Sequence, residues 1–363
     1  MSATNPMSTE VQISVIIPMY DEEKFIGQCL ESLAASTVPQ NRLEVLVVDG
    51  GSSDRSRAII QERAGRFSSL RLLENPKRLP GAAMNVGIAE ARGEYVVRMD
   101  SHSEYPPEYI QTCIEELLRT GAANVGGCCV TRPGAETSLA HAFALFAQHP
   151  FGVGNSRFRL GRGGANVDTV PFGTFRRELF TRLGGFREDL VRHEDYEFNS
   201  RIRAAGGKVY LSDRIQSWYH NVPTFGRFLR QAWRGGYWNA RCWLTSRHSF
   251  AWRHSPPLLF VAALLFCAAW DAVERQGIYA FAAILALYGI TALVASASIA
   301  WRHGWKFVVV MPLLFFSYHF VYGVATTAGA LGTPFARGTC PPPAAAKREA
   351  ELDANAQSRV TRV

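Results

Sequence analysis

Short runs of consecutive apolar residues alternate with segments of helical spacing along the first half of the chain. The apolar runs, which predict buried strands, lie at 13–18, 43–49, 70–74, 95–99, 123–130 and 208–213. The segments that predict helices lie at 24–36, 55–64, 81–91, 107–119 and 195–205. Apolar strands joined by crossover helices indicate an α/β fold with a doubly wound, mostly parallel sheet and helices on both faces.

The second half of the chain has a different character. Residues 224–254 interleave arginines with aromatic residues, which is typical of a helix that lies in a membrane interface. Three apolar stretches follow, at 255–270, 276–301 and 307–336. Because a membrane-spanning helix needs about 20 residues, the second and third stretches are long enough and the first is marginal.

These patterns divide the chain into five predicted parts. They are a polar tail over 1–12, an α/β domain over 13–220, an interfacial segment over 221–255, a membrane region over 256–335 with two to three transmembrane helices, and a disordered tail over 336–363. The first ten residues are polar and show no secretion signal, so we expect the α/β domain in the cytoplasm. With three spans, the loop 302–306 would be cytoplasmic, and the loop 271–275 and the tail would lie outside; Lys347 and Arg348 argue weakly against an outer tail.

The charge and the cysteines narrow the class of protein. Lys and Arg number 39 against 31 for Asp and Glu, a net charge of +8 that suits nucleotide phosphates, acidic lipids or nucleic acid as partners. The basic residues cluster in 227–253, beside the apolar stretches, which favours membrane lipids over nucleic acid. The seven cysteines form no CxxC pair, so we expect a reducing compartment and neither a disulfide framework nor a zinc site.

Acidic residues stand at the carboxyl ends of three predicted strands, where ligands bind in doubly wound sheets. They are Asp21, Asp49 and Asp100. The first strand ends in "PMYDEE" without glycine, which argues against a dinucleotide-binding dehydrogenase. Strand-end acids suit hydrogen bonds to a nucleoside and a divalent cation on its diphosphate. The alternative for Asp21, Glu22 and Glu23 is that they only cap the next helix.

Four motifs carry a resemblance to a known family. They are "VIIPMYDEE", "VVDGGSSDRS", "GAAMNVGIAEARGEYVVRMDSH" and "HEDYEFNSRIRAAGGKV". In this order and spacing, over about 14–215, they resemble the inverting glycosyltransferases of family 2, which have the GT-A fold. The Asp-x-His pattern, "YPPEYI" and "VPFGTFRRELFTRLGGF" are similar to bacterial exopolysaccharide glucosyltransferases of the succinoglycan type.

The resemblance implies roles for matching residues on the donor side. Pro18, Tyr20 and Glu22 would line the nucleotide pocket, and Asn85 would sit near the donor. Asp49 would bind the base without the help of a second acid, because Gly50 stands where the family usually has one. In "DSH", Asp100 would be the first ligand of Mg²⁺ or Mn²⁺, and His102 stands where the second aspartate normally is. The alternative for His102 is a polar turn that binds nothing.

On the acceptor side, Asp195 corresponds to the carboxylate that activates the attacking hydroxyl. Its neighbour Glu194 cannot share that role, and the alternative for both is a capping pair at a helix start. Trp218 and His220 are candidates to bound the acceptor site, although core packing explains them equally well. Gln231 and Arg234, in "QAWRG", resemble the Gln-x-x-Arg-Trp motif of processive synthases without its tryptophan. A basic interfacial helix explains them at least as well.

The predicted activity is the inverting transfer of one hexose from a nucleotide-diphosphate sugar, with UDP-glucose the expected donor. The expected acceptor is a polyprenyl-linked saccharide of exopolysaccharide or cell-envelope glycan assembly. The enzyme would be a multi-pass protein of the cytoplasmic membrane with its catalytic domain facing the cytoplasm, and other glycan-assembly proteins are further expected partners. Two alternatives stay open, a processive polysaccharide synthase and a catalytically silent membrane scaffold.

Overall fold

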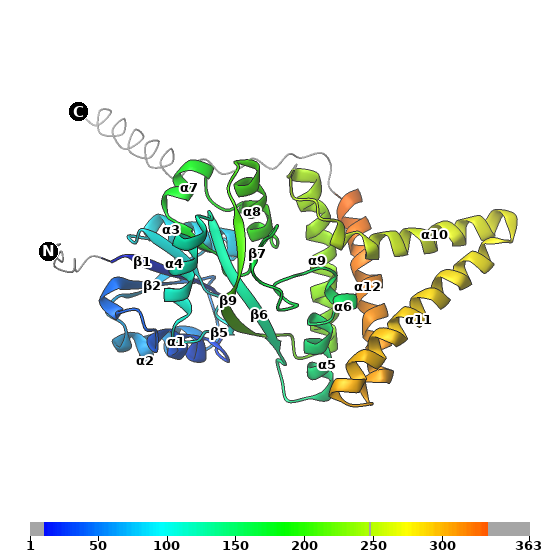
Figure 1. The fold of residues 1–363 in the computed structure, drawn as a ribbon, viewed down its shortest axis with the longest axis horizontal. Coiled ribbons are helices and arrows are strands. Elements are labelled where there is room, and N and C mark those ends of the chain that lie inside the picture. The colour runs from blue at the N-terminus through cyan, green and yellow to red at the C-terminus, as the bar shows by residue number, and fades with distance from the viewer. Residues whose placement is uncertain (1–10, 247, 333–363) are drawn as a thin grey trace. The chain divides into compact units, whose positions relative to one another are not determined.

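The computed structural model describes residues 11–246 and 248–332 (Figure 1). The chain forms two compact units, and each is considered by itself. The described residues of the first unit are 11–127 and 163–217, and those of the second are 128–162 and 218–332 without residue 247. The boundary falls within two strands, Asn124–Arg132 and Val209–His220.

The elements of the α/β part follow in chain order. The strands are β1 (Ile13–Met19), β2 (Leu43–Asp49), β3 (Leu70–Glu74), β4 (Tyr95–Arg98), β5 (Ser103–Glu104), β6 (Asn124–Arg132), β7 (Ala165–Asn166), β8 (Thr174–Arg176) and β9 (Val209–His220). The helices are α1 (Ile26–Ala34), η1 (Gln40–Arg42), α2 (Ser56–Arg63), η2 (Ala64–Arg66), α3 (Pro80–Glu90), α4 (Tyr109–Thr120), α7 (Glu178–Leu183) and α8 (Glu194–Ala204). The strands and helices predicted for this part are confirmed to within a few residues, except that β9 continues to His220.

The sheet has the order β3-β2-β1-β4-β8-β6-β9-β5, with β7 paired to β9. The pairs β1–β2, β1–β4 and β2–β3 are parallel, whereas β4–β8, β6–β8 and β7–β9 are antiparallel. The prediction of a mostly parallel sheet therefore describes the β3-β2-β1-β4 half, and the whole sheet is mixed. The carboxyl ends of β1, β2 and β4 meet at one edge, because neighbouring parallel strands end together.

The central strands are buried along nearly their whole length, which explains their apolar sequences. Every residue of β2 is buried, including Glu44. Its carboxylate is satisfied by the Ser14 hydroxyl at 2.6 Å and by the guanidinium groups of Arg71 and Arg92 at 3.1 and 3.0 Å. A buried charge persists in a strand only with such partners, so this carboxylate belongs to the structural core.

The second unit is mainly helical. Its helices are α5 (Ser138–Ala147), α6 (Pro150–Val153), α9 (Phe225–Thr245), η3 (Trp252–His254), α10 (Pro256–Glu274), α11 (Gly277–His303) and α12 (Phe307–Leu331). Helix α12 packs along α9, and α10, α11 and α12 pack against one another. A buried cluster that includes Phe143, Phe146, Phe228 and Phe315 joins α5, α9 and α12, and α11 contributes to it as well.

Three helices are long and apolar enough to cross a membrane: α10, α11 and α12. The stretch that was marginal by sequence becomes the 19-residue helix α10. Near the end of this helix, Asp271 Oδ1 accepts a hydrogen bond from the backbone N–H of Ile278, at the start of α11, at 3.0 Å. The predicted tails lie mostly or wholly outside the described residues, and Lys347 and Arg348 lie outside them.

Candidate active site

Hydrogen bonds between side chains and backbone join the loops that follow β1 and β2. The Asp21 backbone N–H donates to the Ser52 hydroxyl at 2.8 Å, and the Ser53 N–H donates to Asp21 Oδ1 at 2.8 Å. The Glu22 N–H donates to the Ser56 hydroxyl, also at 2.8 Å. Asp21 adopts a positive φ of 52°, which few residues other than glycine and Asn or Asp tolerate. These bonds hold the carboxyl ends of the two strands as one rim.

Asp49, at the end of β2, is fully buried within this rim. Its carboxylate accepts from the Ser52 N–H at 3.0 Å and the Ser52 hydroxyl at 2.6 Å. The Arg57 guanidinium balances its charge at 3.1 Å. The next residue is Gly50, and a Cβ there would lie 3.2 Å from the ring of Tyr20. The half-exposed Tyr20 ring thus packs on the position where the family usually has a second acid.

His102 connects the β1 loop to the loop after β4. Its Nδ1 lies 3.0 Å from Glu22 Oε1, and both side chains are partly buried. Burial opposes the charged imidazole, but the hydrogen bond and the charge of Glu22 outweigh it, so the pKa of His102 is raised above its ordinary value. Glu22 and His102, predicted separately as a nucleotide-pocket residue and a metal ligand, are therefore direct partners.

Arg98, at the end of β4, is a site residue that the sequence reasoning missed. Its Nε donates to Asp100 Oδ1 at 3.0 Å and its Nη1 donates to Glu194 Oε1 at 3.0 Å. Only 12% of its side chain is exposed. Burial opposes its charge, but Asp100 and Glu194 raise the pKa of Arg98 above its ordinary value. A charged residue in the otherwise apolar run "YVVRM" was the available signal.

Asp195 follows Glu194 at the start of α8. Its Oδ1 accepts from the Tyr196 backbone N–H at 2.7 Å, and its charge adds to the negative field around Arg98. Burial raises the pKa of Glu194, although the charge of Arg98 opposes this rise. Glu194 therefore faces Arg98, and the structure gathers Asp100, Glu194 and Asp195 around one guanidinium group.

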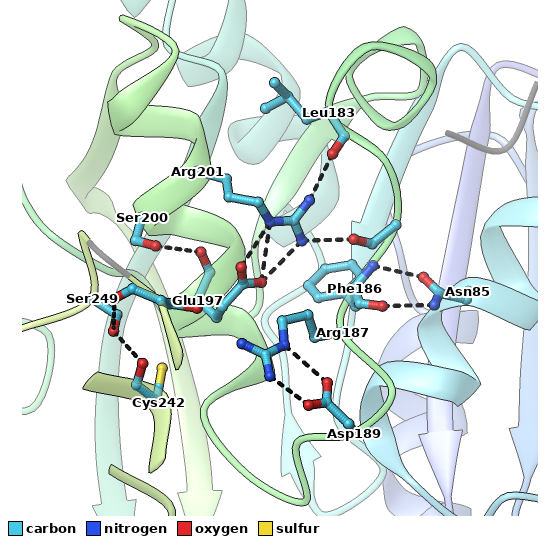
Figure 2. Close-up of polar contacts among 12 residues, drawn as sticks. Asn85, Leu183, Phe186, Arg187, Asp189, Glu197, Ser200, Arg201, Cys242 and Ser249 are labelled. Carbon is cyan, nitrogen blue, oxygen red and sulfur yellow. Dashed lines mark hydrogen bonds and ion pairs between the residues drawn. The ribbon is translucent and has the colours of Figure 1, made fainter. Parts of the chain in front are cut away.

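The segment before α8 is held by polar contacts on both sides, as Figure 2 shows. The amide of Asn85, on α3, pairs with the backbone of Phe186: Nδ2 donates to the Phe186 carbonyl at 2.8 Å and Oδ1 accepts from its N–H at 2.7 Å. Nδ2 also reaches Glu188 Oε1 at 2.7 Å. Asn85 thus positions this segment, and its contact with the donor stays a prediction.

From α8, Arg201 fixes the same segment. Its guanidinium donates to the carbonyl groups of Leu183 at 2.7 Å and Gly185 at 2.6 Å, and it pairs with Glu197 at 2.9 Å (Figure 2). Arg187 pairs with Asp189 through two hydrogen bonds. The helix that begins with Glu194 and Asp195 is therefore anchored to α3 through residues 183–188.

The resemblance to GT-A enzymes implies a divalent cation, and the residues present are compatible with one. Among residues 11–246 and 248–332, no cluster of three or more His, Cys, Asp or Glu side chains could hold a metal by itself. Mg²⁺ in nucleotide sites usually takes only one or two carboxylates, and phosphates and water complete its shell. Asp100 Oδ1 accepts from Arg98, which leaves Oδ2 as the oxygen to offer the cation. His102 is the other candidate ligand.

The four other acceptor-side candidates belong to the second unit. The Arg132 guanidinium lies 4.8 Å from the ring centre of Trp218, and His220 Nδ1 lies 3.4 Å from the Pro133 carbonyl oxygen. On α9, Gln231 is half-buried and Arg234 is exposed. Trp218 and His220 thus have packing partners within their own unit, and an acceptor role for these four residues stays a prediction.

Arg98→Met should show whether the guanidinium group assembles the site. Removing it leaves Asp100 and Glu194 unpaired in a nearly buried place, so we expect the free energy of unfolding to fall by about 3 kcal/mol. We also expect transfer to fall more than donor binding, because the acids lose their common partner. Thermal unfolding and steady-state kinetics measure the two effects.

Arg176→Met is the matched control, because Arg176, on the neighbouring strand β8, forms an exposed pair with Glu94. An exposed pair contributes at most about 1 kcal/mol. Equal stability and activity of the two variants would contradict the role of Arg98.

Comparison with known proteins identifies the family. The family model described as Glycosyl transferase family 2 matches residues 14–184. The succinoglycan biosynthesis protein ExoA of Rhizobium meliloti is 31% identical over 321 residues, which is 82% of this chain and 95% of that protein. The chain belongs to glycosyltransferase family 2. It is a glycosyltransferase, as the four motifs predicted.

Other similar proteins agree with this result. A dolichyl N-acetyl-alpha-D-glucosaminyl phosphate 3-beta-D-2,3-diacetamido-2,3-dideoxy-beta-D-glucuronosyltransferase of Methanococcus voltae is 28% identical over 227 residues, 60% of this chain and 70% of that protein. The mannosyltransferase PcManGT of Pyrobaculum calidifontis, solved with GDP-Man and Mn²⁺, has a TM-score of 0.56 at 21% identity, over 89% of this chain and 88% of that one. That likeness concerns the fold alone, and the predicted GT-A fold is confirmed.

Proposed function

We propose that this family 2 enzyme transfers a single hexose, with inversion, from UDP-glucose to a polyprenyl-linked saccharide. The supporting observation is the grouping of Asp100, Glu194 and Asp195 around Arg98, in the same unit as the rim that holds Asp49. The name of the Rhizobium meliloti relative, a succinoglycan biosynthesis protein, supports a role in exopolysaccharide assembly. No nucleic acid takes part in this proposal.

In the proposed mechanism, the base binds at the rim that holds Asp49, while Pro18, Tyr20 and Glu22 line its pocket. Asp100 and His102 would hold Mg²⁺ or Mn²⁺, which when bound neutralises charge on the departing diphosphate. Arg98 keeps the Asp100 carboxylate turned toward that place.

At the acceptor, Asp195 takes the proton from the attacking hydroxyl. The hydroxyl oxygen forms a bond to C1 of the sugar as the bond from C1 to the diphosphate oxygen breaks. A single displacement of this kind inverts the anomeric centre.

Two alternatives make different demands on the second unit. A processive synthase would carry a tryptophan after Arg234, but Gly235 stands there, and even a Cβ would lie 3.1 Å from the ring of Tyr322. Tyr322 belongs to α12, which packs along α9. A side chain at this position would require the Tyr322 ring to shift, and the absence of the motif's tryptophan favours transfer of a single sugar. A silent scaffold is distinguished by measuring donor hydrolysis.

Contacts within the second unit support the proposed orientation in the cytoplasmic membrane. Lys306, in the turn between α11 and α12, donates to the Ser138 hydroxyl at the start of α5, at 3.1 Å. Helix α5 begins at Ser138, shortly after β6 ends at Arg132. It has only 10 residues, so it is too short to cross a bilayer. The turn 302–306 therefore lies beside the start of α5, and we propose that both are on the cytoplasmic side of the membrane.

Residues 224–254 are proposed to lie at the bilayer surface. The exposed aromatic side chains of Phe225, Trp233, Phe250 and Trp252 suit the interface, while another face of α9 is covered by α12. Other glycan-assembly proteins remain proposed partners of this membrane-bound enzyme.

The deciding experiment offers membranes that contain the full chain a panel of labelled nucleotide-sugars and follows the label into the lipid extract. We expect the label from UDP-glucose to enter the lipid fraction as one hexose per acceptor. Label from a different donor would change the sugar assigned, and label in a long polymer would favour the processive alternative. No donor hydrolysis in any arm would support the scaffold.

A further inference from the structure

The turn between α11 and α12 has features typical of a segment that lies in the headgroup layer of a membrane. Trp301 and Trp305 are 79% and 66% exposed, and their rings meet edge to face with centres 6.4 Å apart. Exposed indole groups at the ends of apolar helices are typical of the membrane–water interface. Because α11 ends here and α12 begins here, this turn lies at the polar end of two candidate spans.

A cavity of about 350 Å³ opens between this turn and the start of α5. Its polar lining comes from both elements: His303 and Lys306 from the turn, and Glu136, Thr137, Ser138 and His141 from the start of α5 and the residues before it. The Lys306 ammonium group lies at the Ser138 hydroxyl. Ala144, Leu145 and Phe307 add an apolar wall. The cavity therefore combines cationic and hydroxyl groups with an apolar side.

Several groups at this cavity favour an anion. Helix α5 begins here, and only the Ala140 N–H of its first turn is capped by the Thr137 side chain, at 3.1 Å. The start of a helix attracts negative charge, and Lys306 adds a full positive charge. The Thr131 hydroxyl, on a 97% buried residue of the lining, has no hydrogen-bond partner within the described part of the chain.

We propose that this cavity binds the phosphate of a membrane lipid headgroup. Lys306, the Ser138 hydroxyl and the start of α5 contact the phosphate, and the apolar wall takes the first carbons of the lipid. Glu136 on the lining repels a dianion such as inorganic phosphate and so favours a singly charged phosphodiester. The inference rests on the proposed membrane attachment but not on the donor, acceptor or chemistry of transfer.

The test uses the full chain, purified in detergent and stripped of lipid. It is titrated with phosphatidylglycerol, and bound lipid is counted by native mass spectrometry. We expect Lys306→Gln to weaken binding by about fivefold. Glu136→Gln should strengthen it, because it removes a negative charge from the lining. Arg302→Gln removes a positive charge from the same turn without lining the cavity, so it should change binding by less than about twofold.

Parallel titrations with polyprenyl monophosphate and inorganic phosphate identify the source of the phosphate. Binding of polyprenyl monophosphate but not of phosphatidylglycerol would overturn the proposed preference for a phosphodiester, because polyprenyl monophosphate is a phosphomonoester that is largely dianionic at neutral pH. Equal losses in Lys306→Gln and Arg302→Gln would overturn the proposal in favour of general surface charge. Binding of inorganic phosphate as tight as that of either lipid would also overturn it. Donor hydrolysis, measured on the same samples, reports separately on the proposed activity.

Discussion

Asp195→Asn should lower transfer by about 100-fold or more while donor binding survives. The amide keeps the shape of the carboxylate but cannot take the proton of the attacking hydroxyl. Asp195 lies at the start of α8, which Arg201 and the segment 183–188 hold in place, so the substitution should not move the helix. Transfer is measured with labelled donor, and donor affinity by calorimetry on the same preparation.

Two further variants serve as a control and a comparison for Asp195→Asn. Asp213→Asn removes an exposed carboxylate in the same unit and should leave transfer unchanged. Glu194→Gln should act differently from Asp195→Asn, because it weakens the pair with Arg98 and so lowers stability together with activity. Near-normal turnover in Asp195→Asn would remove this residue from the role of base.

Asp100→Asn should lower metal-dependent transfer on the order of 100-fold, the size expected when a stabilising group for the leaving charge is lost. The amide weakens both the hold on the cation and the pairing with Arg98. The measurement is the transfer rate as a function of added Mn²⁺ or Mg²⁺. A variant that keeps the normal rate and the normal metal dependence would show that Asp100 does not act on the diphosphate.

Variants of His102 distinguish two roles for this residue, a metal ligand and part of a polar turn. If the imidazole is a ligand, His102→Asp should retain activity with a changed preference between Mn²⁺ and Mg²⁺, because an oxygen ligand suits Mg²⁺ better. His102→Ala should lower the rate, and it also removes the partner of Glu22. An unchanged rate and metal dependence in His102→Ala would leave Asp100 as the working residue of "DSH".

The local patterns of the sequence were sufficient for most elements of the fold. The apolar runs 13–18, 43–49 and 70–74 correspond to β1, β2 and β3, because a strand buried on both faces needs apolar residues at consecutive positions. The motifs, read through family resemblance, were sufficient for the enzyme class and the GT-A fold. Both signals are carried by residues that lie close together along the chain.

The antiparallel pairing in the other half of the sheet was not available from such patterns. Strand β8 has only three residues, yet it lies between β4 and β6 in the sheet. So short a strand has no period to detect, and its place depends on pairing with residues far away in the chain. For this reason the sheet is mixed, although the sequence predicted it to be mostly parallel.

The sequence by itself determined the class of enzyme and placed the candidate acids at strand ends, whereas the tertiary structure decided how these acids are connected. Arg98 donates hydrogen bonds to both Asp100 and Glu194, and Glu194 lies 96 positions after Arg98 in the chain. Glu22 contacts His102, which lies 80 positions after it. Hydrogen bonds between segments so far apart form only when the sheet brings the ends of β1 and β4 together with α8. The periods of 2 and 3.6 residues describe only neighbours along one element, so they hold no information about which side chains pair across the fold.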